Sequence, residues 1–186
     1  MFVVFSLSNI YRAIRELVDG NITGDKWKPA VVVIDYLQVL PIDPEIKKAT
    51  HEEQRRLQVA QDVERLRKMT IALECPIIVP LQAKQELKGN NTPYMIPGTY
   101  DGMETSAIAT RFDRIVSLWI PKTTYLVGST AWDRDKTKSI TVSENQSFIK
   151  VNKQRGGLPA GKTWELKIDY EQQEYTDVFY SKKNGA

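Results

Sequence analysis

The stretch VVVIDYLQVLP, residues Val31–Pro41, decides the fold of this chain. Its first four residues, Val31–Ile34, are branched and apolar, which is typical of a strand buried on both faces in a parallel sheet with helices on either side. The apolar run stops at Asp35, and open α/β sheets bind their ligands at the carboxyl ends of their strands. The pattern therefore predicts a central strand with a functional carboxylate at its end; the alternative is an Asp that caps the following turn.

A second apolar run, Pro76–Leu81, ends in the polar residue Gln82. If both runs are strands of one sheet, Gln82 lies at the same edge as Asp35. An apolar strand that ends in Asp also has the Walker B arrangement, in which the carboxylate holds the Mg²⁺ of a bound nucleotide directly or through water. We therefore expect Asp35 on the metal side of a nucleotide site.

Helices are predicted before and between these strands. Ser8 or Asn9 can cap a first helix that ends at Gly20. Thr50–Glu53 has capping-box spacing and begins the longest helix. Its buried positions are predicted to be Val59, Val63, Leu66, Thr70 and Leu73, and its solvated positions Arg55, Arg56, Arg65, Arg67 and Lys68.

The remaining segments complete a mixed fold. Lys84–Tyr100 is rich in Gly, Asn and Pro and is predicted to be a functional loop, followed by a short helix over 101–110 and a third buried strand over 113–120. Ser147–Asn152 and Thr163–Tyr170 alternate in polarity around a Gly-rich turn, which predicts a hairpin. With an apolar strand over 2–5, this order indicates an α/β fold: a RecA-like three-layer core with a mostly parallel sheet, incomplete at the N-terminal side, plus a C-terminal antiparallel hairpin.

Composition excludes several classes of function. The chain has 186 residues, 41% of them hydrophobic and 26% charged, and its net charge of +3 is too small to indicate a nucleic-acid binder by itself. The sequence contains no apolar run near the roughly 18 residues of a membrane span, so we expect a cytoplasmic protein without membrane contact. One cysteine, Cys75, and one histidine, His51, rule out an internal disulfide, a zinc cluster and Cys-His catalysis.

Residues Gly156–Thr163 match the phosphate-loop pattern G-x-x-x-x-G-K-S/T letter for letter. A phosphate loop needs a helix that begins at the Lys-Thr pair, so that free N–H groups face the phosphates. The following residues, Trp164–Tyr170, alternate like a strand, and the match comes after the Walker B strand. We therefore interpret Gly156–Thr163 as a hairpin turn; a rearranged phosphate loop is the alternative.

With these segments placed, the chain resembles the C-terminal motor domain of DnaB-type replicative DNA helicases, from just after the Walker A region to the end. Val33–Gln38 resembles that family's Walker B strand and its Asp-Tyr-Leu-Gln continuation. Ile78–Gln82 is similar to the next strand, whose terminal Gln lies between the nucleotide and the DNA-binding loop. Asp101–Asp113 resembles the loop-and-helix segment, and Lys153–Gly157 the segment whose Lys and Arg reach the neighbouring subunit's ATP.

The resemblance implies a partial RecA-like ATPase domain over residues 1–180 and a disordered tail over 181–186. It implies ATP and Mg²⁺ as cofactors of an assembled ring, a homo- or hetero-oligomer of hexameric type, with Asp35 on the metal, Gln82 as sensor, and Lys153 and Arg155 as trans-acting fingers. Single-stranded DNA is the implied ligand, with a primase or a helicase loader as further partners. The implied DNA-side residues are Lys84, Lys88, Met103, Glu104 and Ser106.

The departures from the family pattern limit this reading. The Walker A segment and the catalytic carboxylate that follows it would both lie before Met1, so we expect that this chain alone cannot cradle a triphosphate. Met103 stands in place of an Arg and Ser106 in place of a Gly in the DNA-contacting loop. A catalytically inactive RecA-like module that assembles with or regulates a helicase is therefore the alternative.

Overall fold

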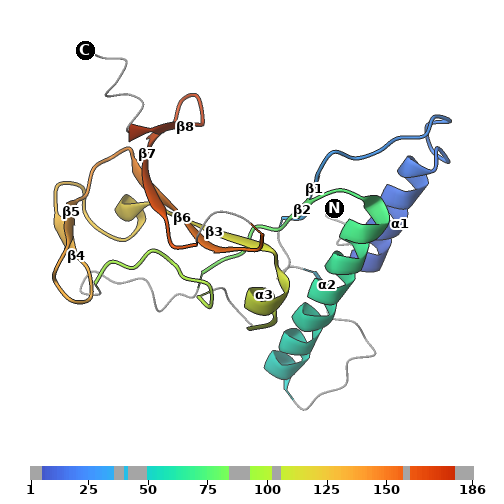
Figure 1. Ribbon diagram of the computed structural model, residues 1–186, viewed down its shortest axis with the longest axis horizontal. Helices are drawn as coiled ribbons and strands as arrows, with labels where there is room; N and C mark the ends of the chain where they lie inside the picture. The colour runs from blue at the N-terminus through green and yellow to red at the C-terminus, as the bar shows by residue number, and fades with distance from the viewer. Residues whose placement is uncertain are drawn as a thin grey trace. The chain divides into compact units, whose positions relative to one another are not determined.

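The computed structural model of the chain describes residues 6–35, 40–41, 50–83, 93–101, 106–156 and 160–178. These residues belong to two compact units. Unit 1 comprises Met1–Gln82 and Met103–Phe112, and unit 2 comprises Ala83–Gly102 and Asp113–Ala186. Each unit is described by itself below (Figure 1). The strand expected over 2–5 and the tail expected over 181–186 lie outside the described residues.

Helix α1 of unit 1 spans Leu7–Val18. Its N-cap is Ser6, whose hydroxyl oxygen accepts a hydrogen bond from the Asn9 N–H at 3.4 Å, so the expected cap at Ser8 or Asn9 is wrong. The helix begins earlier because the cap must precede the first apolar residue, and Leu7 is itself buried. Gly20 follows the helix with a positive φ of 81°, as expected for its end.

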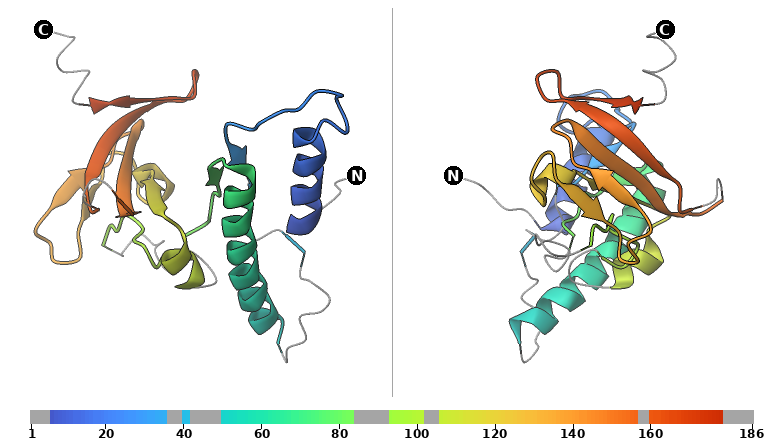
Figure 2. Two further views of the ribbon diagram at one scale, coloured as in Figure 1. Left: turned by 45° about the vertical axis from the view of Figure 1, so that its right-hand side comes forward. Right: turned by 90° about the vertical axis from the view of Figure 1, so that its left-hand side faces the viewer.

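Helix α2, His51–Leu73, lies beside α1 (Figures 1 and 2). Thr50 caps it and accepts a hydrogen bond from the Glu53 N–H at 3.2 Å, as the capping-box spacing predicts. The predicted buried face is confirmed except at Thr70, whose place is taken by Met69. Thr70 is half-buried, and its hydroxyl donates to the Arg67 carbonyl oxygen. The buried apolar residues of the helix are Val59, Val63, Leu66, Met69 and Leu73.

Strands β1 (Val32–Val33) and β2 (Ile77–Ile78) pair in parallel in unit 1. The Ile34 N–H continues the ladder and donates to the Ile78 carbonyl oxygen at 3.0 Å. One face of this pair packs on the helices, whereas Val33 and Ile78 on the other face are 59% and 55% exposed. The expectation of a strand buried on both faces is therefore wrong, because the helices of unit 1 cover one face of the pair.

Helix α3, Ser106–Arg111, completes unit 1 and agrees with the short helix expected over 101–110, of which 102–105 lie outside the described residues. It packs on α2, and Arg111 forms an ion pair with Glu64 of that helix. Ile108 joins the core cluster of Leu7, Val59 and Val63. No helix in the described parts of the chain is long and apolar enough to cross a membrane.

Unit 2 contains a four-stranded antiparallel sheet in the order β3-β6-β7-β8, seen as a twisted layer in Figure 2. A separate antiparallel pair, β4-β5, and a short 3₁₀ helix, η3, complete the unit. The elements are β3 Arg114–Trp119, η3 Pro121–Thr123, β4 Thr130–Trp132, β5 Ser139–Thr141, β6 Gln146–Gln154, β7 Thr163–Asp169 and β8 Glu174–Asp177. The hairpin expected around the Gly-rich turn is confirmed as β6-β7.

The third buried parallel strand expected over 113–120 is wrong. β3 runs antiparallel to β6, and its residues alternate in exposure, with Val116 and Leu118 about half exposed. Its other face is covered by an aromatic stack, in which Trp119 lies 5.5 Å from the ring centroids of both Tyr94 and Phe148. The fold is mixed α/β, but a mostly parallel sheet is not confirmed, since the parallel pairing among the described residues consists of β1 and β2.

Candidate functional site

Asp35 and Gln82 follow the carboxyl ends of the two parallel strands of unit 1. Asp35 comes two residues after β1, Gln82 comes four residues after β2, and both side chains are exposed. The alternation of half-buried and exposed residues continues from Ile77 to Gln82, so Gln82 lies on the same face as Ile78. By the same period of two, Asp35 lies on the face of Val33, which is the register partner of Ile78. The carboxylate and the amide therefore share one edge and one open face.

Asp35 fits one particular kind of metal site. No cluster of three or more His, Cys, Asp or Glu side chains that could hold an ion occurs among the described residues. Magnesium, however, is commonly held by one or two carboxylates together with the phosphates of a substrate and several waters. The exposed Asp35 at a strand end fits that arrangement, whereas the described residues offer no cage made of protein ligands alone.

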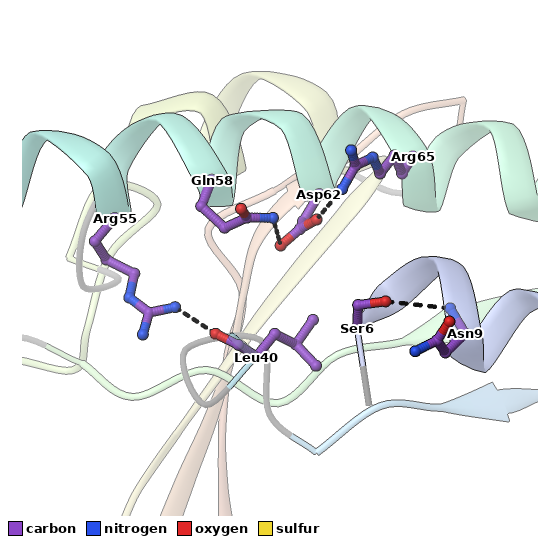
Figure 3. Close-up of polar contacts among 7 residues, drawn as sticks. All are labelled: Ser6, Asn9, Leu40, Arg55, Gln58, Asp62 and Arg65. Atoms are coloured by element: carbon purple, nitrogen blue, oxygen red, sulfur yellow. Dashed lines mark hydrogen bonds and ion pairs between the residues drawn. The ribbon is translucent and has the colours of Figure 1, made fainter. Parts of the chain in front are cut away.

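The helix behind this edge carries a buried polar cluster that the sequence pattern did not predict (Figure 3). Asp62 on α2 is 1% exposed, and its carboxylate accepts hydrogen bonds from Gln58 Nε2 at 2.8 Å and Arg65 Nη1 at 3.3 Å. Two turns before Asp62, Arg55 Nη1 donates to the Leu40 carbonyl oxygen at 2.6 Å. The prediction that Arg55 and Arg65 lie on a solvated face is therefore wrong. Both are half-buried, and the hydrogen bond of Arg55 connects α2 to Leu40, which follows Asp35 by five residues.

Burial raises the pKa of the Asp62 carboxyl above its ordinary value, although Gln58 and Arg65 act in the opposite direction. A raised pKa in the folded state means that the proton is bound more tightly there than in the unfolded chain. The stability that this proton contributes is present at low pH and is lost as the pH rises through the raised pKa.

Replacing Asp62 by Asn should remove this pH dependence. As the pH rises from about 4, the ordinary pKa of Asp, toward neutrality, the original protein should lose this contribution to stability and Asp62→Asn should not. The free energy of unfolding of Asp62→Asn should therefore increase relative to that of the original protein. Urea unfolding at a series of pH values measures the difference. Asp25→Asn, which alters an exposed carboxylate before β1, is the control. A constant difference between Asp62→Asn and the original protein across this range would contradict the assignment.

In unit 2, Lys153 and Arg155 lie where β6 ends, next to a break in strand register. Lys153 pairs with Ile115, but Val151 pairs with Val116, so that Asn152 is an extra residue in β6. Such a bulge changes the face to which the following residues point. Lys153 and Arg155 therefore share the face of Ile115 and Asp113 instead of the face of Val116, which Val151 occupies.

The side chain of Asn152 holds this bulge in place. Its Nδ2 donates to Ser117 Oγ at 2.5 Å and to the Pro97 carbonyl oxygen at 2.9 Å. The backbone carbonyl oxygen of Asn152 accepts a hydrogen bond from Thr99 Oγ1 at 3.5 Å. Asn152 therefore joins β3, β6 and the described end of the Lys84–Tyr100 loop. The sequence carried one signal for this bulge, the polar Asn152 within an alternating strand, since Asn is disfavoured in strands.

The described C-terminal end of the Gly156–Thr163 segment leads into a strand, as expected for a hairpin turn. Gly156 and Gly161 have positive φ angles of 66° and 96°, and β7 begins at Thr163, directly after Lys162. The chain therefore continues from the Lys-Thr pair as a β-strand and does not present the N–H groups of a helix N-terminus to a phosphate.

We expect the Lys162→Ala variant to bind Mg-ATP as the original chain does, because Lys162 lies at an exposed hairpin end. Titration of both proteins with a fluorescent ATP analogue is the measurement. Tight binding by the original chain that disappears in Lys162→Ala would instead establish a rearranged phosphate loop.

The predicted DNA-side residues fall largely outside the described parts of the chain. Lys84, Lys88, Met103 and Glu104 are not described, and Ser106 is the first residue of α3, without a described side chain. The end of the preceding loop is described in unit 2, where the Tyr94 N–H donates to the Trp132 carbonyl oxygen at 2.7 Å. The DNA contacts therefore stay predictions.

The chain was compared with known proteins at three levels. No family model matches it, and no curated protein does either. A solved structure of the ATPase domain of a DnaB-like helicase is similar, with a TM-score of 0.64 and 22% sequence identity over 93% of this chain and 51% of that one. The chain thus spans about half of that structure's length. The match shows that this chain shares the fold of part of that ATPase domain.

Proposed function

We propose that this chain is a portion of the ATP-dependent motor of a DnaB-like replicative DNA helicase that acts only within an assembled ring. The observation that carries the proposal is the position of two exposed polar residues, Asp35 and Gln82, after the carboxyl ends of the parallel strands β1 and β2. Ligand sites of open α/β sheets form at this edge. The similarity of 93% of the chain to the fold of an ATPase domain supports the same reading.

On the nucleotide side, Asp35 is the residue that would hold Mg²⁺. Bound there, the ion would neutralise charge that develops on the phosphates during transfer. Gln82 follows the adjacent strand and leads directly into the Lys84–Tyr100 loop. A hydrogen bond between the Gln82 amide and the γ-phosphate would form only while ATP is intact. Its loss on hydrolysis would change the conformation of the loop and so its contact with DNA.

Lys153 and Arg155 act on a different nucleotide, the one bound to a neighbouring subunit. Their shared face at the end of β6 presents two cations together. A guanidinium beside the γ-phosphate stabilises the charge of the transition state, which is the role of an arginine finger. Because these cations act in trans, the activity requires an oligomeric ring, for which we propose a hexamer.

Single-stranded DNA is the proposed ligand of this ring. Lys84 and Lys88 would contact phosphates, and Met103, Glu104 and Ser106 belong to the second DNA-side segment by the resemblance described above. A primase or a helicase loader is the expected protein partner.

A catalytically inactive RecA-like module is the second candidate. It is favoured by the start of β7 at Thr163, directly after Lys162, so that the one match to the phosphate-loop pattern in the sequence does not lead into a helix. Such a module would assemble with a helicase and modulate it without turning over ATP.

Mixing experiments separate the two. The purified chain is combined with a polypeptide that carries the Walker A half of a DnaB-type motor, and ATP hydrolysis is measured with and without single-stranded DNA. Hydrolysis that appears only in the mixture supports the motor, whereas a complex that forms equally well without ATP and hydrolyses none supports the inactive module.

A further inference from the structure

Asp113 lies directly across the sheet from the proposed finger Arg155. Arg114, the first residue of β3, and Gln154, the last residue of β6, are register partners. Asp113 and Arg155 are the residues just beyond this pair and continue the ladder. The Arg155 N–H donates to the Asp113 carbonyl oxygen at 2.9 Å. The side chains meet as well, with Arg155 Nη1 at 3.1 Å from Asp113 Oδ1. Backbone and side chain thus attach Arg155 to the same residue.

This ion pair is exposed to solvent. The side chain of Arg155 is 50% exposed and that of Asp113 is 76% exposed. Exposed ion pairs contribute little to stability, because water screens them and both side chains lose freedom. A guanidinium binds a phosphate in the same bidentate geometry as a carboxylate, and a polyphosphate carries more charge. A phosphate that approaches this face can therefore displace Asp113 from Arg155.

The backbone of β6 before Arg155 is held by hydrogen bonds that do not involve the ion pair. The half-buried Asn152, with its hydrogen bonds to Ser117 and Pro97, maintains the bulge three residues before Arg155. Release of the side chain from Asp113 consequently leaves the end of β6 in place. Arg155 would exchange one anion for another while its Cα position stays unchanged.

We propose that Asp113 is a positioning residue for Arg155: a counterion within the same chain that holds the guanidinium ready and yields it to a phosphate of the neighbouring subunit's nucleotide. This inference rests on the proposed function of Arg155. It adds a residue and a regulatory contact to that function, because the finger is neutralised whenever no phosphate competes for it.

The test uses the purified chain and inorganic tripolyphosphate as the probe. Heteronuclear NMR follows the Nε–Hε signal of Arg155, assigned by its loss in Arg155→Ala, during titration at low salt. In Asp113→Asn we expect this signal to be shifted before any phosphate is added, and the affinity for tripolyphosphate to rise by up to about fivefold, the scale of a surface ion pair. Asp113→Glu should restore both values.

Asp135→Asn is the matched control, since it also removes one negative charge from unit 2. Asp135 lies in the exposed turn between β4 and β5. That pair of strands contacts Tyr94, which stacks on Trp119 at the far end of β3 from Asp113. Equal gains in affinity in Asp113→Asn and Asp135→Asn would overturn the proposal, as would a titration in which the Arg155 signal never responds. The thermal midpoint of Asp113→Asn should stay within a few degrees of the original, and a large drop would indicate a structural role instead.

The titration needs no partner, so its result is independent of the mixing experiment. Hydrolysis in the mixture together with a failed titration would overturn the role of Asp113 alone. A successful titration without any hydrolysis would overturn the proposed motor function alone.

Discussion

Arg155→Ala is expected to lower ATP hydrolysis in the mixture with a Walker A-bearing partner by at least about 10³-fold, the lower end of what an arginine finger contributes. The side chain lies on the face of β6 that the bulge at Asn152 selects, together with Lys153. Its removal leaves the charge that develops on the γ-phosphate without its strongest donor. The effect should appear in kcat, with little change in the concentration of ATP that gives half the maximal rate.

The matched control for this substitution is Arg114→Ala. Arg114 is also an exposed arginine of unit 2, and it pairs with Gln154, so it lies on the opposite face from Arg155. Steady-state hydrolysis by the Arg114→Ala mixture should stay within about threefold of the original. A similar loss in both variants would mean that general positive charge, and not a finger, supports the activity.

Asp35→Asn should have the second largest effect, a loss of hydrolysis of roughly 10²–10³-fold, because a metal-held phosphate is worth several kcal/mol in the transition state. Asn has the shape of Asp but lacks the charge that holds Mg²⁺. Raising the concentration of Mg²⁺ should therefore recover part of the activity of Asp35→Asn and should do nothing for Arg155→Ala. Titration of the rate with Mg²⁺ is the measurement.

Asp25→Asn serves as the control, since Asp25 is an exposed carboxylate in the loop before β1 and lies away from the strand ends. Its mixture should show the original rate and the original dependence on Mg²⁺. Were Asp35→Asn to hydrolyse ATP normally, Asp35 would be a turn-capping residue, which is the alternative that its sequence position leaves open.

Local patterns predicted the elements that depend on neighbouring residues. The Thr50–Glu53 capping box begins α2, Gly20 ends α1, and the alternation after Lys162 produces β7 instead of the helix that a phosphate loop requires. These features depend on backbone conformation and hydrogen bonds within a few residues, which amino-acid identity largely decides.

Pairing between distant segments could not be predicted in this way. The run Asp113–Ile120 is as apolar as a buried parallel strand, yet its partner is β6, some 30 residues later, and the pairing is antiparallel. Likewise the sequence predicts that Val33 and Ile78 are core residues, but both are exposed, because the helices of unit 1 cover the other face of their strands. Hydrophobicity indicates that a residue favours burial but does not say which face receives a covering layer.

For the candidate site, the sequence by itself determined the positions of Asp35 and Gln82, because a polar residue that ends an apolar strand is recognisable from its immediate neighbours. Only the tertiary structure decided which face Lys153 and Arg155 occupy and that Asp113 opposes the guanidinium of Arg155. The physical reason is the bulge at Asn152, which exists through hydrogen bonds to Ser117 and Pro97, residues 35 and 55 positions away in the chain.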